Sequence, residues 1–162
     1  CLKSFQTAHA GTYPGAMRAG EGKRTMSTNR MLKGSCLCGA VAYEVEDAFR
    51  YALNCHCTDC RRATGGAFKP IGGIEVEKLS ITSGQDAILR YGDEGPEGSH
   101  DIHCGTCGSL LYSIVQKGTR ANVSLGTLID APSIRPSMHI FVGSKAPWYE
   151  ITDDLPQHER FP

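Results

Sequence analysis

Seven of the eight cysteines fall into three tight groups whose spacing is typical of metal ligands. Along the chain the groups read C-x-C, C-x-C-x-x-C and C-x-x-C, and their members are Cys36 and Cys38, then Cys55, Cys57 and Cys60, then Cys104 and Cys107. Zinc-binding loops present thiolates at such spacings because neighbouring sulfurs of one turn can face the same ion. Disulfides and free core thiols are the alternatives, but residues 1–30 contain no apolar segment of a secretory signal peptide.

The grouping of the sulfurs predicts two zinc ions with different roles. A closed structural site takes four protein ligands, whereas a catalytic zinc keeps three and leaves one position open. We therefore predict a structural zinc on an outer quartet and a second zinc on a central trio. The outer quartet is Cys36, Cys38, Cys104 and Cys107, and the central trio is Cys55, Cys57 and Cys60.

Each group has an alternative interpretation that the sequence leaves open. The outer quartet also fits a redox dithiol or an iron–sulfur site. The central trio also fits a second structural zinc, with His56 or another side chain as its fourth ligand. Glycine follows the second cysteine of each outer pair, at Gly39 and Gly108, and glycine admits the positive φ that turns around a metal often need.

A zinc ion with three thiolate ligands is better suited to binding a thiol than to hydrolysis. The excess negative charge weakens it as a Lewis acid, while sulfur is a soft ligand whose thiolate form the metal stabilises. The trio cysteines are therefore the predicted catalytic group. Arg61, Arg62 and Lys69 are the predicted substrate-binding residues, since an anionic thiol needs nearby cations. The alternative is a solvated basic turn.

Acid–base residues are less clearly marked than the metal ligands. His56, Asp59 and His103 are the local candidates for proton transfer. His139 and Trp148 are expected instead in the core or at a strand edge.

Charge and composition exclude several classes of partner. Lys and Arg balance Asp and Glu at 17 each, and the pI is about 7.1, so a surface that binds nucleic acid through phosphates is not expected. The chain has no run of about 20 apolar residues, so no membrane span is expected. With no secretory signal, the expected localisation is cytoplasmic. The sequence leaves the oligomeric state open.

Short apolar segments separated by glycine, proline and aspartate predict one mostly β domain, a sandwich, barrel or tent of short strands. The expected strands are 41–46, 51–54, 67–71, 74–77, 79–82, 87–91, 100–103, 109–115, 122–125 and 137–142. One helical turn is expected over 58–63, ended by Gly65 and Gly66. Residues 1–31 are basic and poor in acids, and we interpret them as a flexible N-terminal leader or a remnant of cloning, with transit-peptide character as the alternative. The domain itself is expected over 32–162.

Several of these segments resemble the glutathione-dependent formaldehyde-activating (Gfa-like) and centromere protein V family. The matching segments are 34–41 (GSCLCGAV), 55–61 (CHCTDCR), 104–108 (CGTCG), 136–140 (PSMHI), 147–148 (PW) and 153–156 (DDLP). The resemblance covers about Leu32 to Phe161. It implies an Mss4-like fold, antiparallel sheets around the structural four-cysteine zinc, with the trio binding the second zinc.

The resemblance also implies a reaction and its substrates. Glutathione, the co-substrate, adds to formaldehyde to give S-(hydroxymethyl)glutathione, which is a carbon–sulfur lyase activity run in reverse. A small-molecule thiol and a small aldehyde are thus the expected partners. The alternative function is a non-catalytic zinc module that carries glutathione or binds a protein partner. A nucleic-acid-binding zinc ribbon fits the neutral charge poorly.

Overall fold

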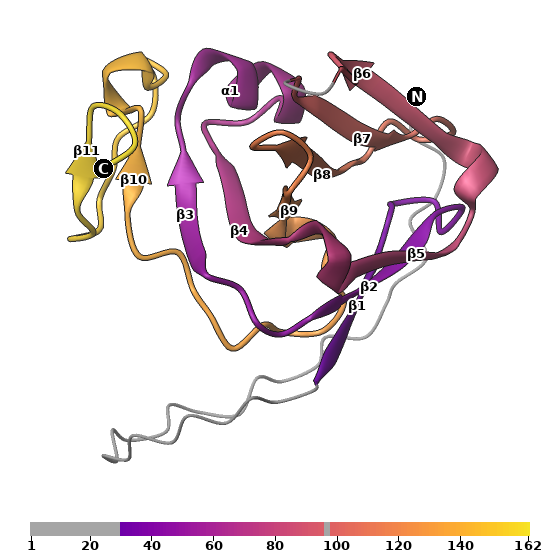
Figure 1. The fold of residues 1–162 in the computed structure, drawn as a ribbon. Coiled ribbons are helices and arrows are strands. Elements are labelled where there is room, and N and C mark those ends of the chain that lie inside the picture. The colour runs from indigo at the N-terminus through magenta and orange to yellow at the C-terminus, as the bar shows by residue number, and fades with distance from the viewer. Residues whose placement is uncertain (1–29, 96–97) are drawn as a thin grey trace, which may run out of the picture.

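Two β-sheets enclose the main hydrophobic core of the computed structural model, which describes residues 30–95 and 98–162 (Figure 1). The smaller sheet has three antiparallel strands in the order β1–β2–β5, with β1 at Met31–Ser35, β2 at Ala42–Glu46 and β5 at Leu79–Ser83. Nearly all of the leader predicted for residues 1–31 lies outside the described residues.

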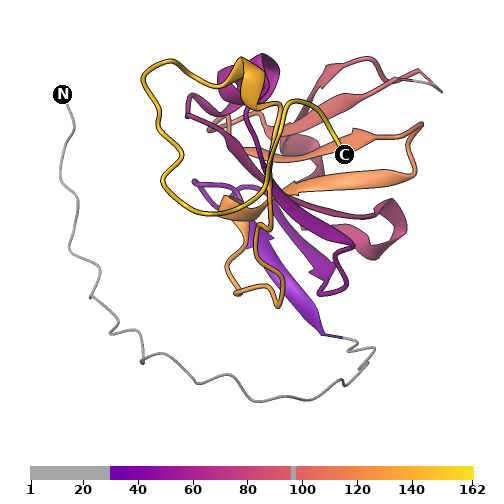
Figure 2. The same cartoon turned by 90° about the vertical axis from the view of Figure 1, so that its left-hand side faces the viewer.

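The larger sheet has eight strands in the order β11–β10–β3–β4–β9–β8–β7–β6. Their bounds are β3 Tyr51–Cys55, β4 Lys69–Glu75, β6 Ile88–Gly92, β7 His100–Cys104, β8 Leu110–Val115, β9 Arg120–Ser124, β10 His139–Ile140 and β11 Gln157–His158. In this sheet order, all neighbouring strands between β3 and β6 pair antiparallel, whereas β10 runs parallel to both of its neighbours, β3 and β11. In Figure 2 the C-terminal segment that contains β10 and β11 faces the viewer.

The core lies between the two sheets, and β1 and β2 of the smaller sheet alternate buried residues with more exposed ones. In β2 the side chains of Tyr43 and Val45 are buried, and they pack with residues such as Ile102 and Val123 of the larger sheet. A smaller apolar cluster lies around Leu53, Cys55, Ile71 and Ile140, with Cys57 and Cys60 packed against it. The cysteines of the central trio therefore belong to this second cluster.

Two glycines provide space for tyrosine rings on the partner strand. Gly34 pairs with Tyr43 between β1 and β2, and Gly73 pairs with Tyr51 between β4 and β3. A Cβ added at either glycine would overlap the ring of its partner tyrosine. The ring thus covers the glycine backbone, and the two strands remain in register.

The only α-helix among the described residues, α1 at Thr58–Thr64, follows β3 directly. Cys57 is its N-cap, with an Sγ that accepts a hydrogen bond from the backbone N–H of Cys60 at 3.4 Å. Gly65 ends the helix in the left-handed conformation at φ 64°. The helix and its predicted glycine stop are confirmed. Four 3-10 turns are also found in residues 30–95 and 98–162, at Val76–Lys78, Gln85–Ala87, Leu125–Thr127 and Val142–Ser144.

The predicted strands agree with the structure, apart from small shifts at their ends, except at four places. Segments 67–71 and 74–77 were expected as separate strands, but Lys69–Glu75 form the single strand β4. The end of the second segment belongs to the 3-10 turn Val76–Lys78. The strand expected over 137–142 is only the two-residue β10, while β1 and β11 were not predicted. No helix in residues 30–95 and 98–162 is long and apolar enough to cross a membrane.

Candidate metal centre and adjoining cleft

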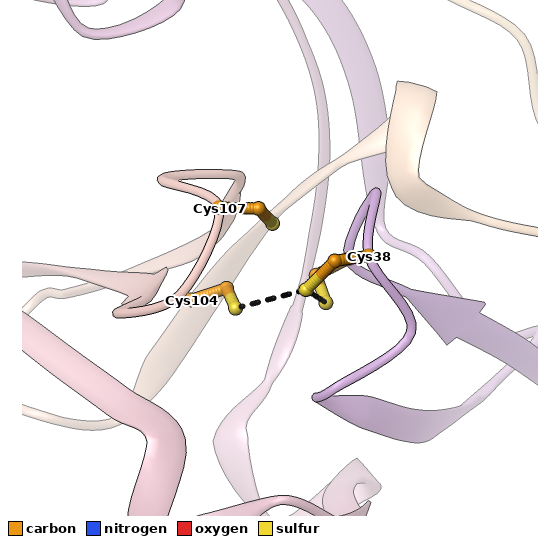
Figure 3. A group of neighbouring side chains, drawn as sticks. Cys38, Cys104 and Cys107 are labelled. Carbon is orange, nitrogen blue, oxygen red and sulfur yellow. Dashed lines mark hydrogen bonds between the residues drawn. The ribbon is translucent and has the colours of Figure 1, made fainter.

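The four sulfurs of the outer quartet converge between two loops, as Figure 3 shows for the side chains it labels. All four Sγ atoms lie within 4.8 Å of one another. Cys38 Sγ is 3.6 Å from Cys36 Sγ and 3.8 Å from Cys104 Sγ. Four sulfurs bound tetrahedrally at 2.3 Å would lie about 3.8 Å apart. The quartet therefore has the dimensions of a four-thiolate zinc site.

Two glycine turns bring the quartet together. Gly39 and Gly108 both adopt φ 77°, as expected, and the Gly108 N–H donates to the carbonyl of Cys104 at 2.8 Å. The backbone N–H of Val41 donates to Cys36 Sγ at 3.3 Å, a contact that favours a thiolate. The hydroxyl and backbone N–H of Ser109 are the main causes that lower the pKa of Cys107 to about 5.

The central trio gathers at the junction of β3 and α1. The Sγ atoms of Cys55, Cys57 and Cys60 lie within 4.8 Å of one another, and no histidine or carboxylate of the described residues joins them at that distance. The spacing of Cys57 and Cys60 places both on one face of the first helical turn. The trio is thus a three-sulfur group without a fourth protein ligand, and none of the seven described cysteines is in a disulfide.

The three trio sulfurs affect one another's ionisation. Hydrogen bonds from Cys55 and Cys60 lower the pKa of Cys57 to about 2. The contact with Cys57 is the main cause that raises the pKa of Cys55 to about 11, and the neighbouring thiols likewise raise the pKa of Cys60. Three thiolates this close would repel each other, so their full ionisation requires a cation among them.

His56 does not join the trio, because its side chain lies in a separate buried group of rings. Its ring is fully buried against Phe68 and Tyr149, and its Nε2 lies 2.7 Å from His139 Nδ1. Burial is the main cause that lowers the pKa of His56, with the charge of His139 as a further cause. The alternative in which His56 is the fourth zinc ligand is therefore not supported.

The histidine pair continues to the surface through an aspartate. His139 Nε2 lies 3.1 Å from Asp153 Oδ1, and Asp153 is half exposed. The Leu155 N–H and the histidine hold the pKa of this carboxyl below its usual range. His139 is buried, as expected, whereas Trp148 is 71% exposed outside any strand and does not belong to the core.

A cleft of about 880 Å³ lies between α1 and one face of the larger sheet. Its lining includes Cys60, Arg62 and Lys69 on one side, and Asp101, His103, Ser113 and Asn122 across the strands. Tyr91, Asp101, Ser113, Asn122 and Gly73 are paired successively from β6 to β4, so their side-chain positions share this face. Gly73 has no side chain, and Tyr51 reaches over it to donate to Asn122 Oδ1 at 2.7 Å.

The predicted cationic residues take three different positions. Lys69 is buried at the floor of the cleft, with 2% of its surface exposed, and its Nζ donates to Ser113 Oγ at 2.7 Å. Burial is the main cause that lowers its pKa, and the charges of Asp101 and the trio oppose this effect. Arg62 is exposed and lines the cleft, whereas Arg61 does not line it. Of the acid–base candidates, Asp59 and His103 line the cleft and His56 does not.

Sequence reasoning missed four polar residues of this region. Ser113, Asp101 and Asn122 lie on the cleft face, and Asp153 completes the buried histidine pair. The only available signal was the alternation of polar residues within β7 and β8, which does not specify what lies on the facing strand.

The fold and the cysteine groups define a two-sheet β protein with two separate cysteine groups that could hold metal ions, one of which adjoins a cleft. The profile of the glutathione-dependent formaldehyde-activating enzyme family matches residues 31–144, and the chain belongs to this family. The family assignment expected from the cysteine segments is thus confirmed.

Known relatives agree with this assignment. A Halomonas elongata protein is 27% identical over 135 residues, covering 75% of this chain and 81% of its own length. A Fusarium vanettenii protein is 31% identical over 84 residues, covering 51% of this chain and 44% of its own length. Both are named "Putative glutathione-dependent formaldehyde-activating enzyme".

A solved structure agrees with the fold. The crystal structure of a Rhodobacter sphaeroides protein superposes with a TM-score of 0.51 at 24% identity, covering 65% of this chain and 92% of that one. The mostly β fold expected for this family is confirmed.

Proposed function

We propose that residues 32–162 form a zinc-dependent enzyme that adds glutathione, or a similar thiol, to formaldehyde or another small aldehyde. Run in the opposite direction, this reaction is that of a carbon–sulfur lyase. The observation that carries the proposal is the position of the central trio, three sulfurs without a fourth protein ligand, with Cys60 on the wall of the cleft. A closed site would have no room for a substrate sulfur.

Both cysteine groups fit zinc, by the sulfur spacing of the quartet and the all-thiolate donor set of the trio. When bound at the trio, zinc stabilises the thiolate form of an incoming thiol. A free thiol of pKa 8.5 is only about 3% ionised at pH 7, so complete ionisation gains about 30-fold, or about 2 kcal/mol. Any larger acceleration must come from side chains of the cleft that position the aldehyde.

Arg62 is the residue best placed to bind a carboxylate of the thiol. It is exposed and lines the same cleft as Cys60, and a guanidinium can bind a carboxylate through two parallel hydrogen bonds. Because the site is solvent-exposed, Arg62→Gln should raise the KM for glutathione only about two- to fivefold. Arg61→Gln is the matched control, since Arg61 is adjacent in sequence but does not line the cleft. Equal effects of the two changes would argue against this role.

The proposal is tested by the rate at which glutathione and formaldehyde are consumed above the spontaneous reaction. We expect Cys57→Ala to abolish this excess rate in protein that is folded and retains the quartet zinc. An unchanged rate in such protein would refute the proposal. Glutathione binding without an excess rate in the wild type would favour the carrier function instead. Because the trio must remain reduced, we place the protein in the cytoplasm.

A further inference from the structure

The Lys69 ammonium lies at the point where the cleft meets the central trio. Lys69 pairs directly with Cys55 between β4 and β3, so both side chains start from the same face of the sheet. Lys69 and Cys60 both line the cleft, and the trio cysteines are close enough to influence the ionisation of Lys69. A substrate that approaches the trio through the cleft therefore passes this ammonium.

A chain of two hydrogen bonds fixes the ammonium in place. Ser113 Oγ accepts from Lys69 Nζ at 2.7 Å and donates its own proton to Asp101 Oδ1. Asp101 and Ser113 are themselves paired between β7 and β8, so the sheet sets their spacing. Because Ser113 donates to the carboxylate, its oxygen presents a lone pair to the lysine. The direction of both bonds is thus determined.

This arrangement leaves part of the ammonium available to a ligand. A lysine ammonium has three N–H protons, and Lys69 makes no other hydrogen bond within the described part of the chain. Its side chain is almost completely buried. Burying a cation whose donors are only partly satisfied is unfavourable unless a further acceptor completes them. The two remaining protons are therefore available to an oxygen acceptor in the cleft, which can be water in the free protein and a substrate oxygen in the complex.

The proposed reaction generates such an acceptor. When a thiolate attacks the carbonyl carbon of an aldehyde, the carbon–sulfur bond forms and the π electron pair of the C=O bond moves onto the oxygen. The resulting alkoxide must be stabilised until it takes up a proton, which balances the proton that the thiol lost. Donors fixed in advance at such an oxygen are among the largest contributions to catalysis.

We propose that Lys69 is a catalytic residue that donates hydrogen bonds to the aldehyde oxygen and to the alkoxide formed from it, with Ser113 and Asp101 as positioning residues. This assignment rests on the proposed function. It differs from a carboxylate clamp at the same residue, because Lys69 is buried beside Cys55 whereas the exposed Arg62 is placed for the distal part of the thiol.

The test compares Lys69→Gln and Ser113→Ala with the wild type in three measurements. Zinc content and a thermal melt establish that each variant is folded and loaded. Calorimetry gives the Kd for glutathione alone. Nuclear magnetic resonance with ¹³C-formaldehyde gives kcat for adduct formation above the spontaneous rate. Lys145→Gln is the control, since Lys145 is partly buried but does not line the cleft.

We expect Lys69→Gln to lower kcat about 100-fold, the effect of removing one oxyanion donor. Its Kd for glutathione should change less than about fivefold, because the residue contacts the aldehyde oxygen and not the thiol's carboxylates. Ser113→Ala should lower kcat about 10-fold, since it keeps the cation but removes the group that positions it. Lys145→Gln should match the wild type.

Three outcomes would overturn the assignment. An unchanged kcat in folded Lys69→Gln would remove the catalytic role. A raised Kd that accounts for the whole loss, with kcat intact, would identify Lys69 as a binding clamp. If Lys69→Gln does not fold, wild-type kcat in Ser113→Ala would refute the hydrogen-bonded arrangement. These results differ from failure of the proposed function, in which the wild type itself shows no rate above the spontaneous reaction.

Discussion

Replacing Cys38 with serine tests whether the outer quartet stabilises the fold. Cys38 Sγ lies 3.8 Å from Cys104 Sγ, and the two residues are 66 positions apart in sequence. A crosslink that closes a loop of this length stabilises a protein by about 4 kcal/mol in the chain-entropy model. In a protein of this size, 1 kcal/mol shifts the Tm by about 2–4 °C. Loss of the crosslink should therefore lower the Tm by about 8–16 °C.

Cys60→Ser is the matched variant, because it removes one ligand from the other group. The trio lies within residues 55–60, and closing so short a loop contributes only about 2 kcal/mol in the same model. We therefore expect about half the Tm shift. Metal analysis should find one zinc per chain in Cys60→Ser. In Cys38→Ser we expect the quartet zinc to be lost, together with the larger Tm shift.

The assays are metal content by mass spectrometry and thermal unfolding followed by circular dichroism, both on protein purified with added zinc. Equal shifts in the two variants would show that both sites are structural. Two zinc ions and an unchanged Tm in Cys38→Ser would refute the reasoning on the quartet altogether.

Three further predictions follow from the fold and the site. Gly34→Ala should lower the free energy of unfolding in urea by about 1–3 kcal/mol, because a Cβ there overlaps the buried Tyr43 ring. Gly126→Ala should have little effect, since a Cβ at Gly126 lies in open space. Equal effects of the two changes would contradict the packing argument. Asp153→Asn should lower the Tm, because it removes the charged partner of His139, whereas Asp154→Asn should leave the Tm unchanged. Thermal unfolding followed by circular dichroism measures both effects. A chelator should remove the trio zinc first, so that adduct formation is abolished while the circular dichroism spectrum persists. Simultaneous loss of adduct formation and of the spectrum would contradict the distinction between the two sites.

The partition of the cysteines was predictable because it depends on local spacing. Cys57 and Cys60 share one helical turn, and each outer pair shares one glycine turn, so sequence separation alone brings those sulfurs together. That the two outer pairs join each other followed only from the count of ligands that zinc requires. The structure places their four sulfurs together.

The floor of the cleft was not predictable in the same way. The contact of Lys69 with Ser113 spans 44 residues and depends on how β4, β9 and β8 are paired, which the pattern of a single strand does not specify. The break expected within β4 has a similar explanation. Gly72 and Gly73 suggest a turn, but a Cβ at either would overlap a ring, of Phe49 or Tyr51, so both glycines belong to one continuous strand.

The parallel pairing of β10 with β3 has a consequence for the order in which the protein assembles. His139 is 83 residues from His56, and Asp153 is 14 residues further on. Contacts between such distant parts of a chain form late, because a long intervening segment must first be brought together. All seven cysteines of the quartet and the trio precede His139 and Asp153 in the order of synthesis. We expect the chain to be able to bind its metals once Cys107 is available, and to bury His56 only after residue 153 has been made.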